Sequence, residues 1–166
     1  CSYKYRADLL NFLSNGRNAM SAPVYLFTGP EAGKRNDAVQ AVKDSLKKKY
    51  GQIEEYLFYA SESAAAEYMA VLQNESLFAS ASCVVVKNAD FIKKKDEIEM
   101  ITDWISSVKS DSSVLVLVSD EISVDSKIEK AVPSANQKKF WEMFENQKLP
   151  WLKNFFSGNG YSIEED

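Results

Sequence analysis

The strongest constraint on the fold is a repeated alternation between short apolar runs and segments with helical periodicity. Apolar runs lie at 23–29, 54–62, 83–90 and 113–121, and the last two contain the continuous stretches VVV and VLVLV. Strands that are buried on both faces lose the polar alternation of a half-exposed strand. Because strands that alternate with helices build parallel sheets, the sequence predicts an α/β fold, with a mostly parallel sheet covered by helices on both faces.

Three segments between these runs carry apolar residues at spacings of three and four, which is typical of helices. The first ends in Lys47-Lys48-Lys49 and is closed by Gly51, as the carboxyl end of a helix favours. The other two span 63–74 and 96–108, and 138–145 is predicted to be a fifth strand. The residues expected to face the core from the helices are Val39, Val42, Leu46, Tyr50, Ala65, Tyr68, Met69, Leu72, Ile98, Ile101, Ile105 and Val108.

The composition excludes several kinds of active site. Histidine is absent from the 166 residues, which removes Ser-His-Asp and Cys-His catalysis and histidine metal sites. The two cysteines, Cys1 and Cys83, are far apart and have no CxxC spacing, so neither a metal site nor a disulfide framework is expected. Cys83 opens the run CVVV and is interpreted as a small buried residue.

The charge and hydropathy pattern favours a cytoplasmic protein. The net charge of −4 does not mark a nucleic-acid binder, and the lysine clusters at 47–49 and 93–95 are interpreted as solvated helix ends, with direct DNA binding as the weaker alternative. No segment approaches the roughly 20 apolar residues that span a bilayer, and the first residues have no signal-peptide core. No membrane contact is therefore expected. A lipidated Cys1 is the alternative, which the globular character of the chain disfavours.

The sequence predicts three parts. Residues 1–21 are interpreted as an N-terminal extension that need not belong to the natural protein, because Asn18-Ala19-Met20 looks like a junction before a natural start. Residues 22–147 form the α/β domain. Residues 148–166 are expected to begin a second, helical domain, because Ser162 and Glu165 have the spacing of a capping box, which announces a helix.

The first strand leads into a glycine loop that lies where a phosphate-binding loop would lie. A working loop has the pattern G-x-x-x-x-G-K-[ST], in which backbone amides hold the phosphates, lysine reaches the outer ones and the hydroxyl binds Mg²⁺. Here only three residues separate Gly29 from Gly33, and Lys34 is followed by Arg35 in place of the hydroxyl. Glu31 adds a carboxylate that would repel a triphosphate. We therefore interpret Gly29, Gly33 and Lys34 as a degenerate, non-functional loop that binds no cofactor, with Lys34 solvated.

The acidic residue that such an ATPase also needs is not at its expected place. The third strand is followed directly by Lys87-Asn88 rather than by a carboxylate. Asp120 and Glu121 end the fourth strand, one strand later than the pattern requires, and are predicted to begin a surface loop. A divergent P-loop ATPase or nucleotide kinase is the alternative function, and it would need one of these two carboxylates to hold Mg²⁺.

An apolar pair precedes the third strand. Leu77 and Phe78 are adjacent in a connection between small and polar residues, so they cannot easily both point into one core. The plainer interpretation is that both cover the end of the second helix, since single exposed apolar residues are ordinary. An exposed pair that a partner protein covers is the alternative.

The order and spacing of these elements resemble the delta subunit of bacterial DNA polymerase III, from about Pro23 to the end of the chain. The resemblance rests on TGPEAGK (28–34), on CVVVKNAD (83–90) with the lysines that follow, and on SVLVLVSDE (113–121). It implies a P-loop NTPase-like fold of the AAA+ type, a five-stranded parallel sheet without a functioning ATP site, followed by a helical lid.

The resemblance also implies a function. Delta subunits bind and open the beta sliding clamp through a Ser-Leu-Phe element with an upstream glutamine, which Gln73, Ser76, Leu77 and Phe78 match. The implied partners are the beta clamp, the delta prime and gamma/tau subunits of the loader, and primed DNA within the complex. The chain would then be a non-catalytic part of the DNA polymerase III holoenzyme, a nucleotidyltransferase, and would have no catalytic residue of its own.

Overall fold

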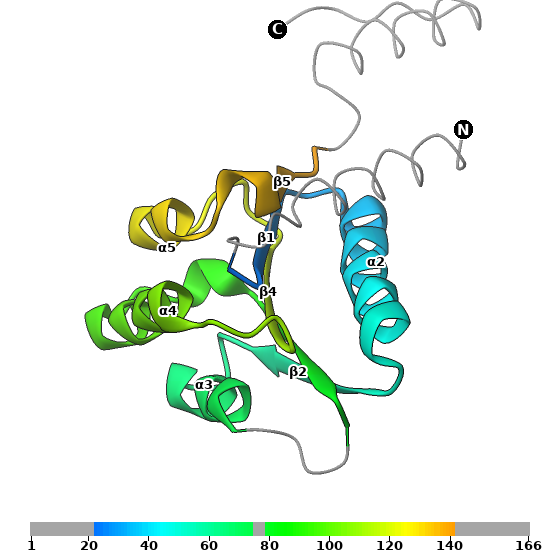
Figure 1. The fold of residues 1–166 in the computed structure, drawn as a ribbon. Coiled ribbons are helices and arrows are strands. Elements are labelled where there is room, and N and C mark those ends of the chain that lie inside the picture. The colour runs from blue at the N-terminus through cyan, green and yellow to red at the C-terminus, as the bar shows by residue number, and fades with distance from the viewer. Residues whose placement is uncertain (1–21, 75–78, 142–166) are drawn as a thin grey trace, which may run out of the picture.

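The computed structural model describes residues 22–74 and 79–141, which form one α/β domain (Figure 1). Five strands build one sheet in the order β2-β3-β4-β1-β5, and every neighbouring pair is parallel. The strands are β1 (Val24–Thr28), β2 (Ile53–Tyr59), β3 (Ala81–Lys87), β4 (Ser113–Ser119) and β5 (Gln137–Lys139), and the helices are α2 (Ala32–Tyr50), α3 (Ala65–Gln73), α4 (Lys95–Ser107) and α5 (Ser126–Ala131).

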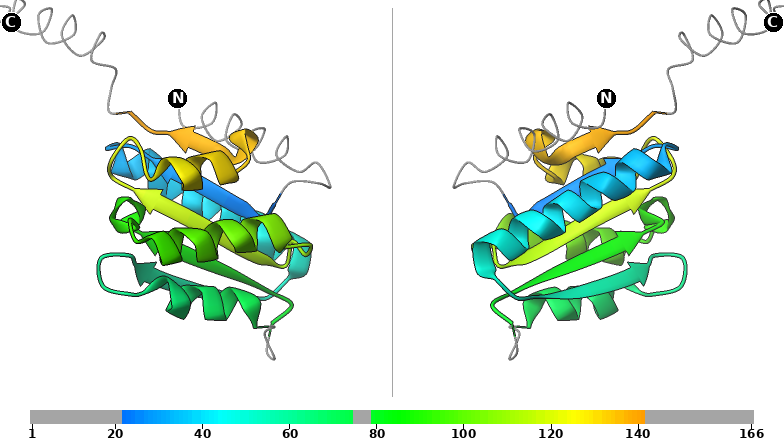
Figure 2. Two further views of the ribbon diagram at one scale, coloured as in Figure 1. Left: turned by 90° about the vertical axis from the view of Figure 1, so that its left-hand side faces the viewer. Right: turned by 90° about the vertical axis from the view of Figure 1, so that its right-hand side faces the viewer.

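The helices cover the two faces of the sheet unequally. Helix α2 crosses one face, whereas α3, α4 and α5 lie side by side on the other (Figures 1 and 2). The continuously apolar strands serve both faces: Leu115 and Leu117 of β4 join the core under the three helices, and Val114, Val116 and Val118 join the core under α2. The prediction of a parallel sheet buried on both faces is therefore confirmed.

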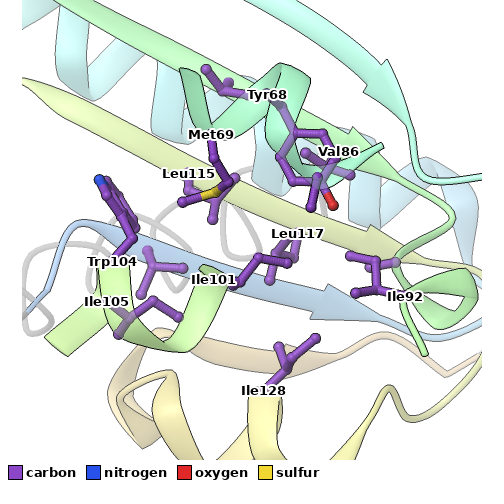
Figure 3. Packing of buried hydrophobic residues seen from close by; sticks show 14 of the residues in the cluster. Tyr68, Met69, Val86, Ile92, Ile101, Trp104, Ile105, Leu115, Leu117 and Ile128 are labelled. Atoms are coloured by element: carbon purple, nitrogen blue, oxygen red, sulfur yellow. The ribbon is translucent and has the colours of Figure 1, made fainter. Parts of the chain in front are cut away.

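The larger core lies between the sheet and the three helices (Figure 3). Ile101 and Leu117 are fully buried there, and Trp104 and Met69 fill the space between α4, α3 and β4. At about 25 cal/mol per Å² of apolar surface, each such side chain contributes roughly 1.5–3 kcal/mol to folding. Most of the predicted inward-facing helix residues are buried; Tyr50 and Val108 are only partly buried.

Two local predictions are also confirmed. Cys83 is fully buried under α2, and its burial raises the pKa of the thiol to about 12. Helix α2 carries its three lysines in the last turn and ends at Gly51, whose φ is 81° and whose amide donates to the Lys47 carbonyl at 2.7 Å.

The carboxyl-terminal part of the domain differs from the prediction. The fifth strand exists, but it runs from Gln137 to Lys139, and residues 142–145 of the predicted segment lie outside the described residues. Phe140 follows β5: its amide still donates to the Thr28 carbonyl, and its buried ring lies edge-on to Phe27, at 5.8 Å between ring centroids. Helix α5 was not predicted, since six residues carry too little periodicity.

No helix within 22–74 or 79–141 is long and apolar enough to cross a membrane. The predicted extension at 1–21 and the predicted second domain at 148–166 lie outside the described residues.

Candidate functional site

The glycine loop lies at the carboxyl edge of the sheet, which is where open α/β folds bind their ligands. Because the strands are parallel, all of them end at this edge. Strand β1 pairs on one side with β4, with Thr28 opposite Ser119, and on the other side with β5, with Thr28 opposite Lys139. The loop at 29–31 is therefore flanked by the ends of β4 and β5 before α2 begins (Figure 2).

Gly29 is enclosed by backbone. Its φ of 111° belongs to a region that L side chains rarely adopt, and an added Cβ would lie 2.0 Å from the Phe140 carbonyl oxygen. Its amide donates to the carbonyls of Ser119 at 3.1 Å and Glu121 at 2.8 Å. Glycine is required here both by the backbone angle and by the close approach of the chain that follows β5.

Glu31 caps the amino terminus of α2. Its carboxylate accepts a hydrogen bond from the Lys34 amide at 2.8 Å, and its own amide donates to the Phe140 carbonyl at 3.2 Å. The amino terminus of a helix is the position that binds phosphate in a phosphate-binding loop. In this domain a carboxylate of the chain occupies it. Gly33 and Lys34 lie in the first turn of α2 and are exposed, as predicted for Lys34.

Arg35 is the most unusual side chain of the site. It is charged yet only 6% exposed. Its guanidinium donates to the Gly29 carbonyl, to the Ser119 carbonyl at 3.3 Å and to the carboxylate of Asp120, with which it forms an ion pair. Buried charges are stable only where such partners surround them. Among the described residues, its buried Nε has no hydrogen-bond partner.

Asp120 begins an exposed loop after β4, as predicted. It follows β4 and not β3, one strand later along the chain than the pattern of a P-loop ATPase requires. Since β4 is the direct neighbour of β1, Asp120 lies beside the glycine loop, and its largely exposed carboxylate pairs with Arg35. Sequence reasoning noted Arg35 only because it stands where a working phosphate-binding loop has the serine or threonine that binds Mg²⁺. The available signal was an arginine and an aspartate that both follow apolar strands.

Further polar groups at this edge bind one another. The Ser119 hydroxyl donates to the Asp90 carboxylate at 2.6 Å and accepts from the Glu121 amide at 3.1 Å. The Thr28 hydroxyl donates to the Ile122 carbonyl at 3.3 Å. The described part of the chain contains no group of three or more cysteine or acidic residues arranged to hold a metal ion.

The described residues that flank the predicted clamp-binding element lie at the opposite edge. Gln73 is the last residue of α3 and is exposed. Ser76, Leu77 and Phe78 lie outside the described residues. The chain leaves the described structure at Asn74 and re-enters it at Ala79, just before β3 begins at the amino edge of the sheet. The element is thus attached at the edge farthest from the glycine loop.

A five-stranded parallel sheet in the order β2-β3-β4-β1-β5 with helices on both faces is the α/β fold of AAA+ domains. Among solved structures, the DNA clamp loader delta protein of Bacillus subtilis is similar over 94% of this chain and 49% of its own, with 17% identity and a TM-score of 0.60.

Two further structures share the fold at lower similarity. PCH-2 of C. elegans is 14% identical over 98% of this chain and 48% of its own, with a TM-score of 0.51. Rif2, solved in complex with the C-terminal domain of Rap1, is 15% identical over 91% of this chain and 58% of its own, with a TM-score of 0.50. The chain thus spans about half the length of the first two. No protein-family model and no curated protein matches the sequence.

Proposed function

We propose that this chain is the clamp-binding module of a bacterial clamp-loader delta subunit, which binds the beta sliding clamp and favours its opening for loading onto primed DNA. The observation that carries the proposal is the string Gln73-x-x-Ser76-Leu77-Phe78, placed between α3 and β3 of a domain whose fold is similar to that of a clamp loader delta protein. The other loader subunits, delta prime and gamma/tau, are the proposed partners of the full-length protein.

The mechanism needs no reaction on this chain. Leu77 and Phe78 would enter an apolar pocket of the clamp, where each buried side chain is worth roughly 1.5–3 kcal/mol. A binder opens a ring only if it binds the open shape more tightly than the closed one. ATP hydrolysis in neighbouring subunits would then supply the energy for release and reloading.

The glycine loop supports a non-catalytic role. In the ATPase or kinase alternative, Asp120 or Glu121 would hold Mg²⁺ beside the nucleotide. Asp120 is instead paired with Arg35, and the amides of Gly29, Glu31 and Lys34 donate to acceptors within the protein. Titration calorimetry with Mg-ATP tests the alternative directly: no heat is expected, and micromolar binding would favour it.

Clamp binding tests the proposal. The full 166-residue chain should bind the beta clamp of its own species in surface plasmon resonance, and Leu77→Ala/Phe78→Ala should weaken the binding at least a hundredfold, which corresponds to about 2.7 kcal/mol. The matched control is Leu57→Ala/Phe91→Ala, which removes the same two residue types from other exposed positions. Equal binding by the first variant, or equal loss in both, would contradict the assignment.

A further inference from the structure

Arg35 links three segments that are distant in the sequence. It stands in the first turn of α2, and its guanidinium contacts the loop at Gly29, the last residue of β4 at Ser119 and the following loop at Asp120. The sequence separations to the last two are 84 and 85 residues. A single buried cation therefore holds together the two strand ends that would enclose a ligand.

A carboxylate of the chain also lies at the start of α2. In a loop that binds phosphate, amides at the start of the helix surround the phosphate and a cation neutralises it. Here the Glu31 carboxylate accepts from the Lys34 amide at the start of α2, while Arg35, in the first turn of the same helix, provides a positive charge. The Phe140 carbonyl accepts from Glu31 and the Phe140 amide donates to Thr28, which closes the loop from the β5 side.

We propose that the Arg35–Asp120 ion pair, together with the Glu31 cap of α2, forms an internal latch that keeps the glycine loop closed without a nucleotide. The latch fixes the carboxyl edge of the sheet whether or not ATP is present. It is a property of this domain alone and does not depend on the clamp-binding proposal.

The latch predicts how backbone amides exchange with solvent. Where a nucleotide holds such a loop, the loop opens when the nucleotide leaves, whereas an internal latch protects the amides of Gly29 and Glu31 at all times. Amide exchange reports such local opening separately from global unfolding. Hydrogen exchange with mass spectrometry on the full chain, with fragments covering 27–36 and 117–123, is therefore the suitable measurement.

Arg35→Met tests the latch, because methionine keeps an unbranched apolar stem and removes the guanidinium with its charge. Exchange in both fragments should become at least tenfold faster, while β2 and α3 exchange as in the wild type. Lys48→Met, an exposed lysine of the same helix, is the matched control and should change neither fragment. Wild-type exchange in folded Arg35→Met would overturn the proposal.

A second variant and a chemical rescue experiment test the same proposal. If Arg35→Met does not fold, Asp120→Ala replaces it and should accelerate exchange in the same fragments by about threefold; no acceleration would count against the latch. Millimolar ethylguanidinium should restore protection to Arg35→Ala, whereas ethylammonium, which lacks the planar donors, should not. Protection of the wild-type loop by Mg-ATP would also overturn the proposal, because it would show room for the ligand that the latch replaces.

Discussion

The surroundings of a glycine with a positive φ angle differ between the two edges of the sheet. Gly29 at the carboxyl edge and Gly51 at the amino edge both have positive φ angles, 111° and 81°. Gly29 is surrounded by the Phe140 backbone, whereas an added Cβ at Gly51 meets nothing within 4 Å. The carboxyl edge is thus tightly packed around Gly29, whereas the amino edge leaves space around Gly51. This contrast indicates that the glycine loop is packed against the chain that follows β5, and that the two glycines are required for different reasons.

The largest expected effect is at Gly29. Gly29→Ala combines an unfavourable φ with a Cβ 2.0 Å from the Phe140 oxygen, so the free energy of unfolding should fall by more than about 3 kcal/mol. Urea denaturation measures it. Gly33→Ala is the control, since its Cβ would lie 3.4 Å from the nearest atom and alanine favours helices; it should be neutral or slightly stabilising. A mild effect at Gly29 would show that β5 and Phe140 can move away.

A smaller effect is expected at Ser119. Ser119→Ala removes the donor to Asp90 and the acceptor of the Glu121 amide at a buried position, which should cost about 1–2 kcal/mol. Ser106→Ala on the exposed side of α4, where the hydroxyl donates only to the Thr102 carbonyl, should stay within about 0.5 kcal/mol. Equal losses of stability for the two variants in thermal denaturation would show that the hydrogen bonds of Ser119 contribute no more than that of an exposed serine.

Gly51 should respond to its backbone angle alone. Gly51→Ala is expected to cost about 1 kcal/mol, the usual cost of placing a side chain at positive φ without a clash. Gly51→Asn should cost about as much, because asparagine tolerates the left-handed region at positive ψ, whereas the ψ of Gly51 is −101°. A loss at Gly51 as large as that at Gly29 would show that the amino edge is also tightly packed, contrary to the comparison.

The smallest effect is expected for the exposed ion pair of the amino edge. The Lys49 ammonium, and then the Tyr50 hydroxyl, bind Asp111 and lower its pKa. Because the folded pKa lies below the unfolded value of about 4, the contribution is present above that value and is lost as the pH falls through the folded pKa. Asp111→Asn should therefore cost less than about 1 kcal/mol at pH 7, after allowance for solvent screening, and the difference should shrink below pH 4 and in 0.5 M salt. A difference that persists at pH 2 would contradict this origin.

Much of the fold was predictable from local patterns. The runs VVV and VLVLV predicted strands buried on both faces, and the spacing of Ile98, Ile101 and Ile105 predicted α4, because these signals depend only on neighbours along the chain. The bounds of β5 were wrong: KKFWEMFE has the composition of a strand throughout, whereas the strand ends at Lys139, before Phe140, whose ring packs against Phe27.

The candidate site was less predictable. The pattern showed what the glycine loop lacks, but the pair of Arg35 and Asp120 depends on β4 being the neighbour of β1, which no local signal encodes. The glycines indicated a tight turn, yet only the return of the chain at Phe140 explains why Gly29 cannot be replaced. For Leu77 and Phe78 the sequence string remains the basis of the prediction.

The position of β1 between β4 and β5 has a consequence for synthesis. The first strand to be made is also the one whose neighbours are made last, because its partners begin at Ser113 and Gln137. On the ribosome, the β2-β3 pair and its helices are complete while the β1 edge is still unpaired and Arg35 has not met Asp120. Such long-range pairing is slow to form, so nascent chains that stop short of Phe140 should be the most prone to aggregation and the first substrates of chaperones.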